Sequence, residues 1–125
     1  MRKLKHREVA GVRDDLLQAQ NFRCAICNIG LTNDTAVLDH CHTTGAIRGV
    51  LCRNCNGIEG KVHNLARRAK RQYTAAWWLD RLASYWENHT SDRHGLMHPT
   101  HKTAEDKRLR ANKLARERRA RAKEV

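Results

Sequence analysis

Apolar side chains in the first half of the chain recur at spacings that distinguish helices from strands. Between residues 5 and 20 they repeat every three or four positions, as on one face of a helix. The repeating residues are Val9, Val12, Leu16 and Leu17. Two short apolar runs follow at residues 36–39 and 47–51, each bounded by turn-forming residues. We therefore predict a helix over residues 5–20 and two strands, the second leading into a helix from Cys52 onward. Gly49, inside the second run, indicates a close approach of another group to the backbone.

A second apolar stripe predicts a helix over residues 75–88, for which Thr74 is a suitable N-cap. The stripe contains Trp78, Leu79, Leu82, Tyr85 and Trp86, with Trp77 beside them. Two interpretations are open: the stripe packs against its own domain, or it packs against a second copy of the chain. A homodimer is therefore one of the two expectations for this segment.

The remainder of the chain is polar. Residues 89–101 predict a loop whose histidines match no metal-site spacing, so we interpret them as surface side chains. Residues 102–125 form a basic tail that begins with a capping-box sequence at 103–106, and its only large apolar residues before the last position are Leu109 and Leu114. A helix with so small an apolar face cannot hold itself to a core. We expect the tail to be frayed or disordered in isolation and to order along phosphates, the alternative being a solvated tail with no role.

The charge of the chain indicates its class of partner. The chain of 125 residues carries a formal net charge of +12 and has a pI of about 10.2. This surplus predicts a polyanionic partner, and nucleic acid leads because neutralising its phosphates releases counterions. No apolar run reaches the length of a membrane span, and no basic amphipathic helix of the membrane-lying type is evident. The N-terminus does not resemble a signal peptide, so a reducing, cytoplasmic compartment is expected.

Four cysteines form two Cys-x-x-Cys pairs, Cys24 with Cys27 and Cys52 with Cys55. Pairs with this spacing hold one structural zinc in a closed tetrahedron of thiolates, which would staple two separate segments together. Two disulfides or redox-active pairs are the alternatives, and a reducing compartment disfavours disulfides. We interpret the fifth cysteine, Cys41, as a bystander. The sequence therefore predicts one zinc ion per protomer.

Groups suited to hydrolysing a phosphodiester lie between and beside these pairs. Asp39 ends the first predicted strand, and Asn56 lies at the start of the helix after the second. Their oxygens are ligands that a hard divalent cation accepts, and His40 has the pKa range of a general base. Successive strand side chains point in opposite directions, so Asp39 and His40 need a bend at the strand end to share a pocket. Taken singly, each residue also has a structural interpretation: a turn cap for Asp39, a helix cap for Asn56, and core histidines or zinc ligands for His40 and His42.

The run from Leu38 to Asn56 resembles the phage recombination endonuclease VII family, which belongs to the HNH, or ββα-metal, nucleases. It contains Asp-His-x-His, then Thr-Gly-x-x-Arg-Gly, then Leu-Cys-x-x-Cys-Asn. The upstream run Ala19-Gln20-Asn21, the first cysteine pair and the downstream pair Glu59-Gly60 also fit, so the resemblance is specific over about residues 15–60. It implies a small α+β fold with a zinc-stapled ββα-metal core and flanking helices. The basic C-terminal helical arm has no clear counterpart in the family, and we predict it from the sequence of the tail itself.

The resemblance implies a role for each residue of the central run. Asp39 and Asn56 would hold a catalytic Mg²⁺ or Mn²⁺, His40 would be the general base, and His42 would contact or orient the scissile phosphate. The structural zinc would be held by Cys24, Cys27, Cys52 and Cys55. The family acts as a homodimer that resolves branched DNA, with its dimer interface in helices downstream of the core.

The chain departs from the family pattern at two positions. Cys41 stands where the best-known member has a second acid, so we assign it no catalytic role. That member also has a downstream glutamate in its metal site, and Trp77 stands at the matching position here. Either Glu59 or Asp80 completes the site, or two protein ligands are enough.

These observations divide the chain into four segments: an N-terminal helix at 1–22, a zinc-bound nuclease core at 23–72, a helical dimerisation segment at 73–101 and the basic tail at 102–125. The predicted function is that of a metal-dependent DNA endonuclease, an HNH-type phosphodiester hydrolase that resolves branched DNA as a dimer. It would act in the host cytoplasm if the chain is phage-encoded. One alternative is a homing-type endonuclease or nickase on a specific duplex sequence, which a monomer suits. The other is a non-catalytic zinc-ribbon module that binds nucleic acid whether or not His40 is present.

Overall fold

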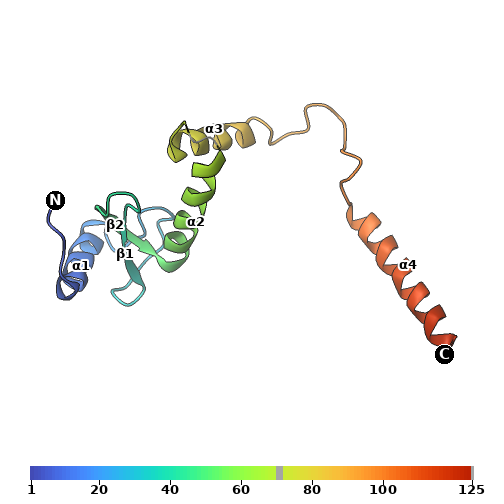
Figure 1. Ribbon diagram of the computed structural model, residues 1–125, viewed down its shortest axis with the longest axis horizontal. Coiled ribbons are helices and arrows are strands. Elements are labelled where there is room, and N and C mark those ends of the chain that lie inside the picture. The colour runs from blue at the N-terminus through green and yellow to red at the C-terminus, as the bar shows by residue number, and fades with distance from the viewer. Residues whose placement is uncertain (70–71, 125) are drawn as a thin grey trace. The chain divides into compact units, whose positions relative to one another are not determined.

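The computed structural model describes residues 1–69 and 72–124, and the chain forms two units, Met1–Tyr85 and Trp86–Val125 (Figure 1). The elements, in chain order, are η1 (His6–Glu8), α1 (Val9–Ala19), β1 (Ala36–His40), β2 (Ile47–Cys52), α2 (Arg53–Ala69), α3 (Ala75–Glu87) and α4 (Ala104–Lys123). The fold is α+β, as predicted. Residues 70–71 of the predicted core and residue 125 of the predicted tail lie outside the described residues. Among the residues described, none of the helices combines the length and apolar character that a membrane span requires.

One small core lies between α1 and the two-stranded sheet (Figure 1). The predicted helix over residues 5–20 is divided, because its first turn is the 3₁₀ helix η1. Leu17 of α1 and Val50 of β2 are both fully buried. The other buried members of the cluster are Cys24, Leu31, Ala36 and Leu51. A core of this size supplies little stability by itself, which is the situation in which small domains rely on a metal.

The side chain of Gln20 joins the end of α1 to β2. The backbone N–H of Val50 donates to Gln20 Oε1 at 2.8 Å, and Gln20 Nε2 donates to the Val50 carbonyl at 2.9 Å. A Cβ atom on Gly49 would lie 3.0 Å from Gln20 Oε1. The close approach that we predicted at this glycine is therefore confirmed, and it explains why no side chain is present there.

The two predicted strands form an antiparallel hairpin, β1 with β2, and α2 follows β2 directly. Each strand is one residue longer than predicted. α3 begins after Thr74, whose Oγ1 accepts a hydrogen bond from the Trp77 N–H at 3.1 Å, which is the predicted N-cap. None of the residues of α3 is buried. Trp77 stacks on Tyr73 with ring centroids 4.0 Å apart, and the Arg81 guanidinium carbon lies 4.9 Å from the Trp77 ring centroid.

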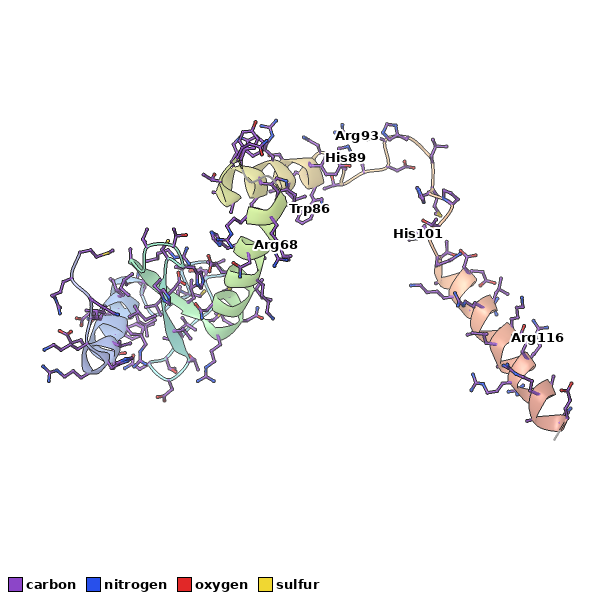
Figure 2. The ribbon with its side chains drawn as sticks, in the orientation of Figure 1. Arg68, Trp86, His89, Arg93, His101 and Arg116 are labelled. Carbon is purple, nitrogen blue, oxygen red and sulfur yellow. The ribbon has the colours of Figure 1, made fainter. Side chains whose placement is uncertain are left out.

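The second unit contains α4, a helix of 20 residues with none buried. The sequence predicted a frayed or disordered arm in isolation, and the structure instead has one continuous helix. Local interactions explain the difference, because the Thr103 N–H donates to Asp106 Oδ2 at 3.0 Å and the Asp106 N–H donates to Thr103 Oγ1 at 3.1 Å, closing the predicted capping box. Glu105 also pairs with Arg108. Side chains extend from all sides of α4 (Figure 2).

Candidate functional site

The four cysteines of the two pairs meet at one point. Their sulfur atoms all lie within 4.8 Å of one another, and Cys27 Sγ lies 3.9 Å from Cys52 Sγ. A tetrahedral zinc with bonds of about 2.3 Å to sulfur places its ligands about 3.8 Å apart. A disulfide requires sulfurs about 2.05 Å apart, and the four thiols are free. The predicted zinc ligands are therefore assembled in zinc-like geometry.

The electrostatics of the cluster also suit a cation. Burial opposes ionisation of Cys24, but hydrogen bonds from the backbones of Cys27, Cys52 and Ile26 outweigh it and lower the pKa of this thiol to about 6. The pKa of Cys55 is raised to about 12, first because its thiol shares a hydrogen bond with Cys52 and second because it is desolvated. Four thiols this close cannot all ionise without a positive charge among them. A divalent cation with a preference for thiolates satisfies the whole set.

A bulge in the hairpin arranges the central run. Asp39 pairs with Gly49 and His40 pairs with Ile47, so Arg48 is an extra residue in β2. Such a bulge bends a strand and redirects side chains. The predicted bend at the strand end is therefore present, although it arises in β2 and not in β1.

The bulge places Arg48 against two carboxylates. Arg48 Nε donates to Asp39 Oδ2 at 2.7 Å, and its Nη2 donates to Asp39 Oδ1 at 3.0 Å. The same Nη2 lies 3.0 Å from Glu59 Oε1 on α2. The hydrogen bond to Asp39, and then that to Glu59, raises the pKa of Arg48 against the opposing effect of burial. Asp39, at 6% exposure, is the one buried charged side chain of the described residues. The ion pair with the Arg48 guanidinium thus offsets the free-energy cost of burying the Asp39 carboxylate.

His42 continues this line of contacts onto α2. His42 Nε2 lies 3.4 Å from Glu59 Oε2, and its ring centroid lies 5.5 Å from that of His40. A Cβ atom on Gly60 would lie 3.3 Å from His42 Nε2, so the glycine leaves room for the ring. Contacts therefore connect His40 with Asp39 by way of His42, Glu59 and Arg48. Asp39 lines one hollow with Arg48 and Glu59, and His40 lines another beside Ile47.

One face of α2 carries the residues that this helix supplies to the candidate site. Residues three, four and seven positions apart lie on one side of a helix, which groups Asn56, Glu59, Gly60 and His63. Asn56 is half-buried in the first turn of α2. Of the two acids considered from the sequence, Glu59 contacts Arg48 and His42, whereas Asp80 is exposed on α3.

Sequence reasoning did not identify Arg48 or His63 as members of this cluster. The His63 ring centroid lies 6.3 Å from that of His42, and its Nδ1 is buried without a hydrogen-bond partner among the described residues. Glu59 Oε2 is likewise buried without a hydrogen bond there. The seven-residue spacing from Asn56 was the available signal for His63. The signal for Arg48 was its place in the Thr-Gly-x-x-Arg-Gly part of the family pattern, although its contacts depend on the bulge.

A family model described as recombination endonuclease VII matches residues 2–88 of this chain. The match covers most of the chain, from ahead of η1 to the end of α3, and includes the cysteine cluster and every residue of the site described above. The helix α4 lies beyond it.

Proposed function

The chain belongs to the recombination endonuclease VII family and is thus a nuclease that acts on DNA, and from this premise we propose that it is a metal-dependent endonuclease whose reaction centre is the β-hairpin and the first turns of α2. The observation that carries the proposal is the contact line from Asp39 through Arg48 and Glu59 to His42, next to a cysteine cluster suited to zinc. An isolated turn cap or core histidine would not need such a connection.

In this proposal Asp39 and Asn56 supply the oxygen ligands of the catalytic Mg²⁺ or Mn²⁺. Asp39 suits the role because a carboxylate has about four lone-pair positions and Arg48 uses one on each oxygen. Asn56 offers an amide oxygen from a half-buried position on α2. When bound, the cation would neutralise charge on the phosphate and on the leaving 3′ oxygen.

The two histidines of the central run have different surroundings, which supports different roles. His40 is exposed, as a general base that takes a proton from attacking water must be accessible to that water. His42 is about half exposed and is held from one side by Glu59. A ring supported in this way is suited to orienting the scissile phosphate.

The direct test is cleavage of labelled four-way junction, nicked and linear DNA in the presence of Mg²⁺. His40→Ala should reduce the single-turnover rate by about 10²–10⁴-fold, the usual contribution of a general base, while DNA affinity stays nearly unchanged. His94→Ala, in the exposed loop before α4, is the matched control and should cut normally. Near-normal cutting by His40→Ala would remove this residue from the mechanism, and DNA binding without cutting by the wild-type chain would favour the non-catalytic module.

We further propose that the apolar stripe of α3 forms a two-fold dimer interface and that the dimer resolves branched DNA. The C-terminal part of the stripe is exposed: Tyr85 and Trp86 are 61% and 64% exposed, whereas Trp78, Leu79 and Leu82 are half-buried. Exposed aromatic patches of this kind commonly mark interfaces. A two-fold dimer would present two active sites to one DNA and give paired cuts on opposite strands.

Light scattering at micromolar concentration tests the dimer. The wild-type chain should have the mass of a dimer, and Trp86→Glu should shift it towards the monomer. Leu96→Glu adds the same charge at a position that is 85% exposed outside the stripe and should leave the mass unchanged. A wild-type monomer, with and without DNA, would instead favour the homing-type nickase.

A further inference from the structure

Arg48 interacts with the candidate catalytic residues more extensively than any role in folding the hairpin requires. It is the extra residue of the β2 bulge, so it has no cross-strand partner of its own. Its side chain is 38% exposed, and its guanidinium contacts both Asp39 of β1 and Glu59 of α2. One side chain thus joins the end of a strand to the helix that faces it.

The geometry of these contacts is specific to arginine. Nε and Nη2 form a planar fork with the two oxygens of Asp39, at 2.7 and 3.0 Å, which fixes the rotation of that carboxylate. Nη2 is shared with Glu59 Oε1 at 3.0 Å, so the two acids lie on either side of one nitrogen. Two carboxylates at such a separation repel each other unless a cation lies between them.

We propose that Arg48 is a positioning residue of the nuclease site, which holds Asp39 and Glu59 in place before the catalytic cation binds and competes with that cation for their negative charge. The proposal rests on the proposed function, because it takes Asp39 to be a ligand of the cation. Through Glu59, whose other oxygen lies 3.4 Å from His42 Nε2, Arg48 also determines where the His42 ring is held.

Two opposite consequences follow from this arrangement. Removing the guanidinium removes a positive charge beside Asp39, so a divalent cation should bind more tightly. Removing it also frees Asp39 and Glu59 to move apart, and displacing a catalytic group by about 1 Å costs on the order of 10²-fold in rate. A residue that merely stabilised the fold would not produce this combination, because a loosened site would bind metal less tightly and cut less well.

The experiment uses the full-length, zinc-loaded protein and has two readouts. Mn²⁺ affinity is measured without DNA by electron paramagnetic resonance, and cleavage is measured as a single-turnover rate at saturating Mn²⁺. Arg48→Gln should bind Mn²⁺ about 3–10-fold more tightly, in line with the loss of one nearby positive charge, and should cut about 10–100-fold more slowly. Arg48→Lys keeps the charge but not the fork, so it should bind Mn²⁺ as the wild type does and still cut more slowly.

Arg13→Gln is the matched control. Arg13 also pairs with an aspartate, Asp14, with its Nε and Nη2 each at 3.0 Å, but on α1 and away from the candidate residues. It should change neither readout. The proposal is overturned if folded Arg48→Gln binds Mn²⁺ with unchanged or weaker affinity. If Arg48→Gln does not fold, Arg48→Lys decides, and a wild-type cleavage rate in that variant overturns the proposal. Failure of the proposed function is a different result: the wild-type chain would bind no Mn²⁺ that depends on Asp39, or would not cut DNA.

Discussion

The hairpin region that carries the cysteine cluster and the helix α4 are held by opposite means. In the first, residues distant in sequence meet: Gln20 bonds to Val50, and the two cysteine pairs join segments on either side of β1. In α4 the interactions described are local, namely the capping box at Thr103 and the pairing of Glu105 with Arg108. The first region therefore depends on long-range contacts and contains a cysteine cluster suited to zinc, whereas the second depends on helix propensity and capping.

Their charges differ in the same way. In the hairpin region, positive and negative groups are paired within a site, as Arg48 is with Asp39 and Glu59. Along α4 the basic residues outnumber the acidic ones, and Arg116 is one that extends away from the helix (Figure 2). Paired charges position reacting groups, whereas unpaired exposed charges attract a polyanion without regard to its sequence. The comparison suggests that one region carries out the chemistry and the other adds affinity.

The largest expected effect comes from removing zinc from the first region. Cys52→Ser, or chelation of the metal, should unfold residues 1–69, since structural zinc contributes about 10–16 kcal/mol in small zinc-dependent domains. The helix α4 should remain, because the interactions described for it are local. Backbone NMR spectra would report this as a loss of dispersed core signals with retention of helical shifts over residues 104–123. Cys41→Ser, outside the cluster, is the control and should leave the core folded. A folded core in a zinc-free sample would show that the cysteines are not a structural metal site.

A smaller effect is expected from removing the second region. Deletion of the chain after His101 should weaken DNA binding about 10–100-fold at moderate salt. It should also reduce the slope of log affinity against log salt by about 0.9 for each phosphate of duplex DNA that α4 neutralises in the intact chain. Cutting should survive at raised protein concentration, since the candidate catalytic residues all lie upstream. Fluorescence anisotropy at several salt concentrations measures the slope. An unchanged slope would show that α4 does not neutralise DNA phosphates.

The same comparison explains how far sequence reasoning reached. Cys-x-x-Cys spacing and apolar periodicity are local patterns, and they correctly predicted that the four cysteines form one cluster, both strands and the position of α3. The motif window placed Asp39, His42 and Glu59 in one region of the chain, but it could not show that Arg48 joins them. That contact depends on a single extra residue in β2, and a one-residue change of register is invisible to an alternation pattern.

The predicted basic arm is helical, as α4, but it is more continuous than expected, and the reason is again physical. We expected a frayed tail because Leu109 and Leu114 give the helix almost no apolar face to pack. Packing is not what forms this helix: it has a full capping box, acidic residues in the first turn and basic residues in the last, which suit the helix dipole. A hydrophobic pattern predicts whether a helix packs against a core, whereas capping residues predict where a helix begins.

The smallest predicted effect tests that explanation of α4. Thr103→Ala removes the hydroxyl that accepts the Asp106 N–H and should fray the first turn, at a cost on the order of 1 kcal/mol. Acid should do the same in the wild type. The backbone N–H of Thr103, followed by its hydroxyl, lowers the pKa of Asp106, so the charged carboxylate is favoured by the folded cap. Its contribution is therefore present at neutral pH and is lost as the pH falls below the ordinary aspartate value of about 3.9 and through the lowered pKa. Carbon chemical shifts of residues 104–108 report fraying at this end separately from acid release of zinc in the core. Thr100→Ala, just outside the helix, should leave these shifts and their pH dependence unchanged. If the first turn keeps its helical shifts at pH 2, the capping box does not set the start of α4.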